Sequence, residues 1–215
     1  ETNLLYMLWV GRSLTGLNQL LEAERSFTTV IDSFKAQNAE AQQVHDPANL
    51  PEAYFRRAEI KKLQNRRTDA RNDYLKALEL MPESVEYLTG YSIYLYENEI
   101  LGECIDHVTQ IENILGDKAD PRLYFVRGLS YLKQNNRSEA ISDLEHALKL
   151  GFAELSDSRI IGIREPAEIY ERLGYLYRDI GKREQARKSL LTFLEKSTSI
   201  SDRTRKEIQG QIDRI

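Results

Sequence analysis

The chain has 215 residues, of which 41% are hydrophobic and 30% are charged, and its formal net charge is −4 at pH 7. This length and composition support one or two folded domains, and they exclude a disordered chain, a collagen-like chain and an integral membrane protein. The acidic balance removes the attraction on which a general binder of nucleic acids or anionic membranes depends. The lone Cys104 can form neither an internal disulfide nor a multi-cysteine metal site.

The sequence repeats itself along nearly its whole length. Residues 53–82 align without a gap with residues 123–152, 70 positions further along the chain. Residues 5–31 and 169–196 align in the same register. Aromatic, small and alanine residues recur at matching places: Tyr54 with Tyr124, Ala58 with Gly128, and Ala70 with Ala140. Self-similarity of this kind predicts a repeat architecture.

Each copy predicts a pair of short amphipathic helices. Apolar residues recur at three- and four-residue spacing, as in Leu123, Val126, Leu129 and Leu132. Turn-forming residues separate the two helices of a pair, at 64–66, 98–99, 134–138 and 180–182. Helices this short are not stable alone, so the copies must stack on one another to form a core.

These features resemble the tetratricopeptide repeat, a helix–turn–helix unit of 34 residues. The family pattern places a bulky residue at position 4, Leu at 7, Gly or Ala at 8, Tyr at 11, Ala at 20, an aromatic at 24, Ala at 27 and Pro at 32. The repeat that starts at Pro51 follows most of it, with Arg57 as a departure at position 7. Five repeats fit the chain: residues 4–37, 51–84, 85–118, 121–154 and 167–200, the third being the weakest match. The resemblance implies an all-α, right-handed superhelical solenoid, with residues 1–215 forming a single domain.

Two insertions interrupt the period, at residues 38–50 and 155–166, and both are expected in loops between repeats. The second insertion carries three isoleucines: Ile160, Ile161 and Ile163. They either pack on neighbouring helices or face a partner, and packing is favoured because exposed apolar clusters are rare on monomers.

The end of the chain predicts one more helix. Within residues 201–215, three isoleucines recur at helical spacing: Ile208, Ile212 and Ile215. We expect a capping helix at about 201–215, because an open repeat array needs its last apolar face covered.

The sequence shows no catalytic, cofactor or metal constellation. The histidines His45, His107 and His146 are isolated from one another, and there is no HExxH motif, glycine-rich phosphate loop or nucleophile elbow. Cys104 takes the place of an alanine in its repeat and should behave as a small hydrophobe. We therefore predict a protein that is not an enzyme and that has no metal ion or cofactor.

Basic residues cluster at three places, and acidic residues are interleaved with them. The clusters are Lys61, Lys62, Arg66 and Arg67; Arg183, Arg187 and Lys188; and Arg203, Arg205 and Lys206. Such alternation is typical of solvated helix faces with compensating pairs. We therefore expect no nucleic-acid partner.

The resemblance also implies where a ligand lies, because the first helices of such repeats line a concave groove that holds peptides or helices. The groove residues predicted here are Trp9, Arg12, Phe55, Arg56, Glu59, Ile93, Tyr96, Phe125, Val126, Leu129, Leu132, Lys133, Arg172, Tyr175 and Arg178. An aromatic stripe rimmed by charges is the composition of a protein-binding surface, which favours a partner with hydrophobic anchors. In the alternative, the apolar members pack against adjacent first helices or against an absent N-terminal part of the chain.

One specific role in the family fails a direct test. Members that hold the acidic tails of heat-shock chaperones use a carboxylate clamp, with Lys and Asn at positions 5 and 9 of one repeat. Here those positions carry pairs such as Leu8 with Arg12 and Phe55 with Glu59, and no register fits. We therefore predict that the protein does not bind such tails through a carboxylate clamp.

The expected function is that of a non-enzymatic adaptor or scaffold that binds a partner peptide or amphipathic helix. Two alternatives stay open: a structural subunit of a homo-oligomer or larger assembly, and an accessory domain of a larger protein. The chain begins with Glu1 rather than Met, so it is expected to be processed or trimmed, and any targeting or anchoring segment would then be missing from it; no membrane insertion is predicted within it. The sequence does not determine the compartment, although the cytoplasm is slightly favoured.

Overall fold

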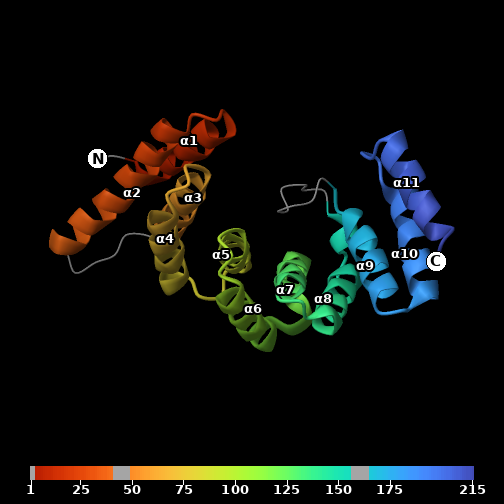
Figure 1. Ribbon diagram of the computed structural model, residues 1–215. Coiled ribbons are helices and arrows are strands. Elements are labelled where there is room, and N and C mark those ends of the chain that lie inside the picture. The colour runs from red at the N-terminus through yellow and green to blue at the C-terminus, as the bar shows by residue number, and fades with distance from the viewer. Residues whose placement is uncertain (1–2, 41–48, 156–164) are drawn as a thin grey trace. The chain divides into compact units, whose positions relative to one another are not determined.

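The computed structural model describes residues 3–40, 49–155 and 165–215, and all regular elements in these ranges are helices (Figure 1). The α-helices are α1 (Leu4–Gly16), α2 (Leu20–Glu40), α3 (Asn49–Leu63), α4 (Arg67–Leu80), α5 (Val85–Glu97), α6 (Leu101–Leu115), α7 (Pro121–Lys133), α8 (Arg137–Lys149), α9 (Glu168–Asp179), α10 (Arg183–Lys196) and α11 (Asp202–Ile212). Two short 3-10 helices, η1 (Gly116–Lys118) and η2 (Phe152–Glu154), follow α6 and α8. The predicted all-α fold is confirmed.

The chain forms two compact units, an N-terminal unit (Glu1–Tyr94) and a C-terminal unit (Leu95–Ile215), and the division falls within α5. In the N-terminal unit α1 packs on α2, α2 on α3, and α3 on α4. In the C-terminal unit α6 packs on α7, α7 on α8, α8 on α9, and α9 on α10. Within each unit, helical hairpins therefore stack on their neighbours as repeats should. A single domain over residues 1–215 stays a prediction.

The turn between the two helices of a repeat has the same geometry in every copy. One residue with positive φ occurs at position 15 of each predicted repeat: Asn18, Asn65, Glu99, Asn135 and Gly181. The next residue donates its N–H to the carbonyl five residues earlier, as Arg66 does to Lys61 at 2.9 Å. This is the Schellman helix end, for which asparagine and glycine are suited because they tolerate the left-handed region. The four turn stretches expected from the sequence are confirmed.

Small residues at position 8 bring the two helices of a repeat into contact. A Cβ atom added to Gly11 would lie 2.6 Å from the Phe27 ring, and one added to Gly174 would lie 2.6 Å from the side chain of Leu190. Gly128 meets Leu144 in the same way, at 3.2 Å. Each glycine thus faces the bulky residue at position 24 of its own repeat. These three contacts agree with the predicted register, and a larger residue at position 8 would clash there.

The predicted capping helix is present as α11, which packs on α10 (Figure 1). Its N-cap is Ser201, whose side chain accepts a hydrogen bond from the N–H of Thr204 at 3.1 Å. Ile208 and Ile212 are 2% and 1% exposed. They form a cluster with Ala167, Leu190, Phe193 and Leu194, and Ile215 packs against it. The cap therefore covers the apolar face of the last repeat.

The first insertion begins as helix, since α2 continues to Glu40, three residues beyond the predicted end of the first repeat. Residues 41–48, with His45, and residues 156–164, with the three isoleucines of the second insertion, lie outside the described residues. The end of the second insertion is anchored through Glu165, which accepts hydrogen bonds from Ser197 Oγ and, at 3.0 and 3.1 Å, from the N–H and Oγ1 of Thr198. Burial opposes ionisation of Glu165, but these bonds outweigh it and lower its pKa to about 2.

Candidate functional site

All fifteen predicted groove residues lie on the first helices of their repeats, α1, α3, α5, α7 and α9. Six belong to the N-terminal unit and nine to the C-terminal unit. Eleven side chains are exposed or half-buried: Trp9, Arg12, Arg56, Glu59, Ile93, Tyr96, Leu132, Lys133, Arg172, Tyr175 and Arg178. Four are buried: Phe55, Phe125, Val126 and Leu129, at 4%, 0%, 3% and 2% exposure.

The four buried residues correct the predicted surface, since they form part of the packing between helices. The Phe55 ring stacks on Tyr87 of α5 with a centroid distance of 4.7 Å. It fits there because position 90 is glycine, where a Cβ atom would lie 2.5 Å from the ring. The Phe125 ring stacks on Phe152 of η2 at 4.3 Å. For Phe55 the alternative considered from the sequence, packing against an adjacent first helix, is therefore correct, whereas Phe125 packs on η2 of its own repeat.

The N-terminal unit carries a continuous series of ion pairs across its first helices. Arg12 of α1 pairs with Glu52 of α3, whose carboxylate is also 3.4 Å from Nε of Arg56. Arg56 in turn pairs with Glu86 of α5 at 2.9 Å. We call Arg12, Glu52, Arg56 and Glu86 the charge ladder. Its side chains are 15–56% exposed, so the stabilisation is modest, but the fixed charges define the polarity of this surface.

Three exposed or half-buried aromatic side chains on the first helices each lie close to a cationic side chain. The guanidinium of Arg12 lies 5.5 Å from the Trp9 ring in the N-terminal unit. In the C-terminal unit Lys133 lies 4.8 Å from the Tyr96 ring, and Arg178 lies 5.1 Å from the Tyr175 ring. Each distance is within the range of a cation–π interaction. The exposed aromatic residues of the predicted surface are therefore paired directly with cations, where the sequence predicted an aromatic stripe with charges at its rim.

A repeated buried ion pair was missed by the sequence analysis. Arg57 donates to both oxygens of Asp73 at 2.7 and 2.8 Å, and Arg127 binds Asp143 with the same two distances. Both arginines also contact a threonine of the preceding repeat, Thr28 at 3.2 Å and Thr109 at 3.1 Å. The signal was available, because each Arg replaces the leucine of position 7 and the Asp recurs 16 residues later in both repeats.

These pairs hold charge inside the fold. Burial by itself lowers the pKa of Arg127, but the carboxylates of Asp143 and Glu112 raise it overall, so the guanidinium stays charged. The side chains of Arg127 and Asp143 are 7% and 8% exposed. With each guanidinium bound by carboxylate and hydroxyl groups of its own unit, the pairs have a structural role.

The cysteine and histidine residues that the structure describes do not assemble into a metal site. Cys104 is fully buried, and desolvation raises its pKa to about 11, so its thiol is protonated at neutral pH. The rings of His146 and Tyr124 lie 4.2 Å apart, and burial lowers the pKa of His107. Within residues 3–40, 49–155 and 165–215, no group of three or more His, Cys, Asp or Glu residues is arranged to hold a metal ion.

The family assignment follows from sequence as well as geometry. The family described as tetratricopeptide repeat matches residues 51–84, 121–150 and 167–200. The chain therefore contains tetratricopeptide repeats at these three positions. These matches begin at Pro51, Pro121 and Ala167, the starting points predicted for three of the five repeats. Among curated proteins, no sequence matches the chain.

Solved tetratricopeptide structures share the fold at low sequence identity. PilW, described as a widely conserved type IV pilus biogenesis factor, has a TM-score of 0.71 at 14% identity, covering 100% of this chain and 86% of PilW. A MamA RS-1 double mutant has a TM-score of 0.69 at 13% identity, covering 91% and 95%. A thermophilic tetratricopeptide repeat protein of Thermus thermophilus has a TM-score of 0.56 at 18% identity, covering 99% and 100%. At these identities the likeness concerns the fold alone. In the described part of the chain, none of the helices has the length and apolarity needed to cross a bilayer.

Proposed function

We propose that the protein is a non-enzymatic adaptor that binds a protein segment on the exposed surface of its first helices. Protein–protein interaction is the general role of tetratricopeptide repeat proteins, and it needs no catalytic group. The observation that supports the proposal most is the set of aromatic–cation pairs on these helices: Trp9 with Arg12, Tyr96 with Lys133, and Tyr175 with Arg178.

Tryptophan, tyrosine and arginine are the residue types that dominate binding energy at protein interfaces. Trp9 is 57% exposed, although burial of an indole ring is strongly favourable. Its neighbours Leu5 and Tyr6 are also exposed, at 51% and 64%. A partner that covers this face of α1 would remove a large apolar area from water while Arg12 keeps its place in the charge ladder.

The paired charges on this surface favour a partner that has hydrophobic anchors and a low net charge. In the charge ladder each arginine is already paired with a glutamate, so it offers no free cation to a carboxylate tail. Glu59 is also engaged, because it accepts from the Tyr74 hydroxyl and pairs with Lys62 at 3.0 Å. An amphipathic helix or an extended peptide with an aromatic or aliphatic anchor fits this surface best.

The test compares two exposed apolar residues of the same unit. Trp9→Ala removes the aromatic from a first helix, whereas the control Leu75→Ala removes a side chain that is 44% exposed on α4, a second helix. Both variants are checked for folding by circular dichroism and used to capture partners from a lysate of the source organism. The captured protein is then titrated against both variants. We expect Trp9→Ala to weaken its binding by about 2 kcal/mol, roughly thirtyfold, and Leu75→Ala to leave it unchanged.

Equal binding by both variants would contradict a site on the first helices. Sedimentation of the purified protein addresses the alternative of a structural subunit, because a permanent homo-oligomer would sediment as such at micromolar concentration. A monomer that captures a partner through Trp9 supports the adaptor.

A further inference from the structure

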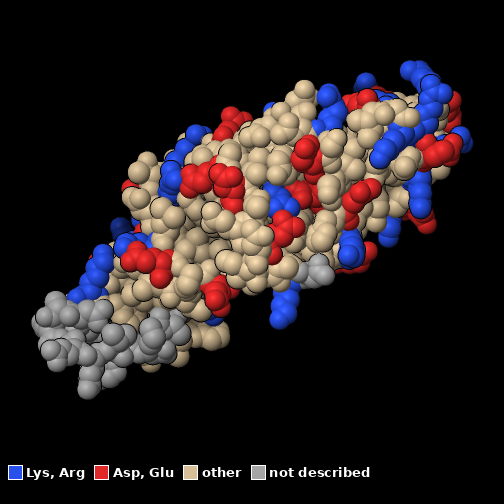
Figure 2. Space-filling view, turned by 90° about the horizontal axis from the view of Figure 1, so that it is seen from below, with Lys and Arg blue, Asp and Glu red and all other residues tan. Residues whose placement is uncertain are grey.

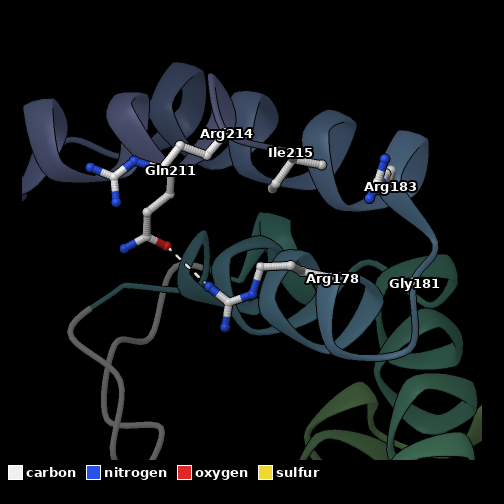
Figure 3. Close-up of a pocket in the computed structure, with 6 residues that line it drawn as sticks. All are labelled: Arg178, Gly181, Arg183, Gln211, Arg214 and Ile215. Carbon is white, nitrogen blue, oxygen red and sulfur yellow. Dashed lines mark hydrogen bonds between the residues drawn. The ribbon is translucent and has the colours of Figure 1, made fainter.

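A pocket of about 560 Å³ opens at the end of the C-terminal unit, where the turn between α9 and α10 meets the end of α11 (Figure 3). Its lining residues are Arg178, Gly181, Arg183, Gln211, Arg214 and Ile215. Gly181 has a positive φ of 77°, and no atom lies within 4 Å of a Cβ added there, so this wall leaves open space. Three of the six lining residues are arginines, and none is acidic.

The arginines are only partly neutralised. Arg178 pairs with Asp179 at 3.1 Å, and its Nη1 donates to Oε1 of Gln211 at 3.4 Å. The guanidinium groups of Arg183 and Arg214 have no hydrogen-bond or ion-pair partner among the described residues. Asp213, next to Arg214 in the chain, instead accepts a hydrogen bond from Gln209 at 3.0 Å. The pocket therefore holds positive charge that is available to a ligand.

Local helix stability does not account for this charge. Arg183 is the first residue of α10, at the positive end of the helix dipole, where an acidic residue stabilises a helix and a basic residue does not. Residues 178–215 carry ten Lys and Arg against six Asp and Glu, although the whole chain is acidic. Figure 2 shows Lys and Arg side chains, with Asp and Glu side chains interspersed, over the part of the C-terminal unit drawn at the right.

We propose that this pocket binds an acidic peptide segment of a protein partner. Figure 3 shows the side chains of Arg183 and Arg214 pointing to different sides of the pocket, so a single small anion would not contact all three arginines. A peptide with several carboxylates presents negative charges at spaced positions, each able to form a charge-assisted hydrogen bond with an arginine. Ile215 adds an apolar contact, which favours an apolar residue among the acidic ones.

The ligand is a protein segment rather than a nucleic acid, because the remainder of the chain carries a clear excess of acids that would repel a longer polyanion. The inference rests on the proposed function in that the ligand is a protein, and the pocket shares Arg178 with the surface proposed above. It differs in location and in ligand chemistry, since that surface takes hydrophobic anchors and this pocket takes carboxylates.

The test uses a fluorescein-labelled peptide of six glutamates around one central isoleucine, and fluorescence anisotropy with the whole chain. The pocket variant is Arg183→Gln with Arg214→Gln; both residues are exposed, so the fold should be retained. The matched control is Arg203→Gln with Lys206→Gln, which removes the same charge from exposed sites on α11 outside the pocket. We expect the pocket variant to bind the peptide about tenfold more weakly than wild type and the control less than twofold more weakly. The affinity should also fall as salt is raised.

Three results would overturn the inference: no binding by the wild type, equal weakening in both variants, and equally tight binding of the same peptide with glutamines. Displacement by millimolar inorganic phosphate, dependent on the same arginines, would identify a single-anion site instead. Trp9→Ala separates this inference from the proposed function, because that variant should bind the acidic peptide normally. If the peptide does not bind while Trp9→Ala still weakens partner capture, this inference alone is wrong.

Discussion

Replacing the arginine should cost more stability in the Arg127–Asp143 pair than in the Arg57–Asp73 pair, whereas replacing the aspartate should cost more in the Arg57–Asp73 pair. The two pairs are matched in geometry but differ in their neighbours: Asp73 also binds Lys61, with Nζ to Oδ2 at 2.7 Å, whereas Arg127 also binds Glu112, at 2.6 Å. Position 11 of the repeat is Lys61 in one copy and Tyr131 in the other. One aspartate therefore has two cations, and one arginine has two carboxylates.

The cost of each variant follows from what it leaves unpaired. Arg127→Met leaves the carboxylate of Asp143, 8% exposed, without a cation, and losing one partner of a buried pair costs about 3–5 kcal/mol. Arg57→Met leaves Asp73 bound to Lys61, so only the hydrogen bonds to a charged group are lost, about 1.5–3 kcal/mol. For the aspartates the order reverses. Asp73→Asn leaves two buried cations, whereas Asp143→Asn leaves Arg127 with Glu112.

The measurement is urea unfolding followed by circular dichroism for the four variants. The single tryptophan, Trp9, gives a separate fluorescence signal for the N-terminal unit, which carries Arg57 and Asp73. We expect Arg127→Met to lose more stability than Arg57→Met, and Asp73→Asn to lose more than Asp143→Asn. Equal costs in both comparisons, or the opposite order, would refute the argument, because the only difference invoked is the second partner.

Two further predictions concern packing and pH. Gly174→Ala should lower the free energy of unfolding by about 1–3 kcal/mol, because its Cβ would lie 2.6 Å from Leu190. Gly102→Ala, with no atom within 4 Å of its Cβ, should raise the free energy of unfolding by about 0.5–1 kcal/mol. Thermal melts that rank the two variants the other way would show that the register is wrong. Glu165 has a pKa of about 2 in the folded chain, below the value of 4.5 in the unfolded chain, so it stabilises the fold fully above pH 4.5 and less as pH falls toward 2. Glu165→Gln should therefore be less stable than wild type at pH 7, with a difference that shrinks between pH 4.5 and pH 2; a difference that is constant with pH would exclude this role.

The repeat register could be predicted because it depends on the spacing of particular residue types along the chain. A residue with positive φ is needed at position 15 of each repeat, and asparagine or glycine occupies four of the five positions. Small residues such as Gly11 and Gly174 mark where the two helices of one repeat approach each other. The number of residues between them and the bulky residue at position 24 is the same in each repeat. Both features depend on neighbours within one repeat, so they can be recognised in sequence alone.

The surface could be predicted only in part. Trp9 and Phe55 both occupy first-helix positions that line the groove in the family, yet one is 57% exposed and the other 4%. The difference arises from the next repeat, where Gly90 lets Tyr87 approach the Phe55 ring. The position of a residue within its repeat predicts which face of the helix carries its side chain, but not how much of that side chain the neighbouring helix buries.

The sequence by itself determined the helical repeats, their turns, their small-residue contacts and the capping helix, because each depends on residues that lie close together along the chain. Only the tertiary structure decided which groove positions stay exposed, how Arg12, Glu52, Arg56 and Glu86 pair across helices, and that Arg178, Arg183 and Arg214 surround one pocket. These features join side chains from different repeats, or from the last repeat and the C-terminal capping segment. Their distances are set by how the helices pack, and packing is a property of the folded chain rather than of local spacing.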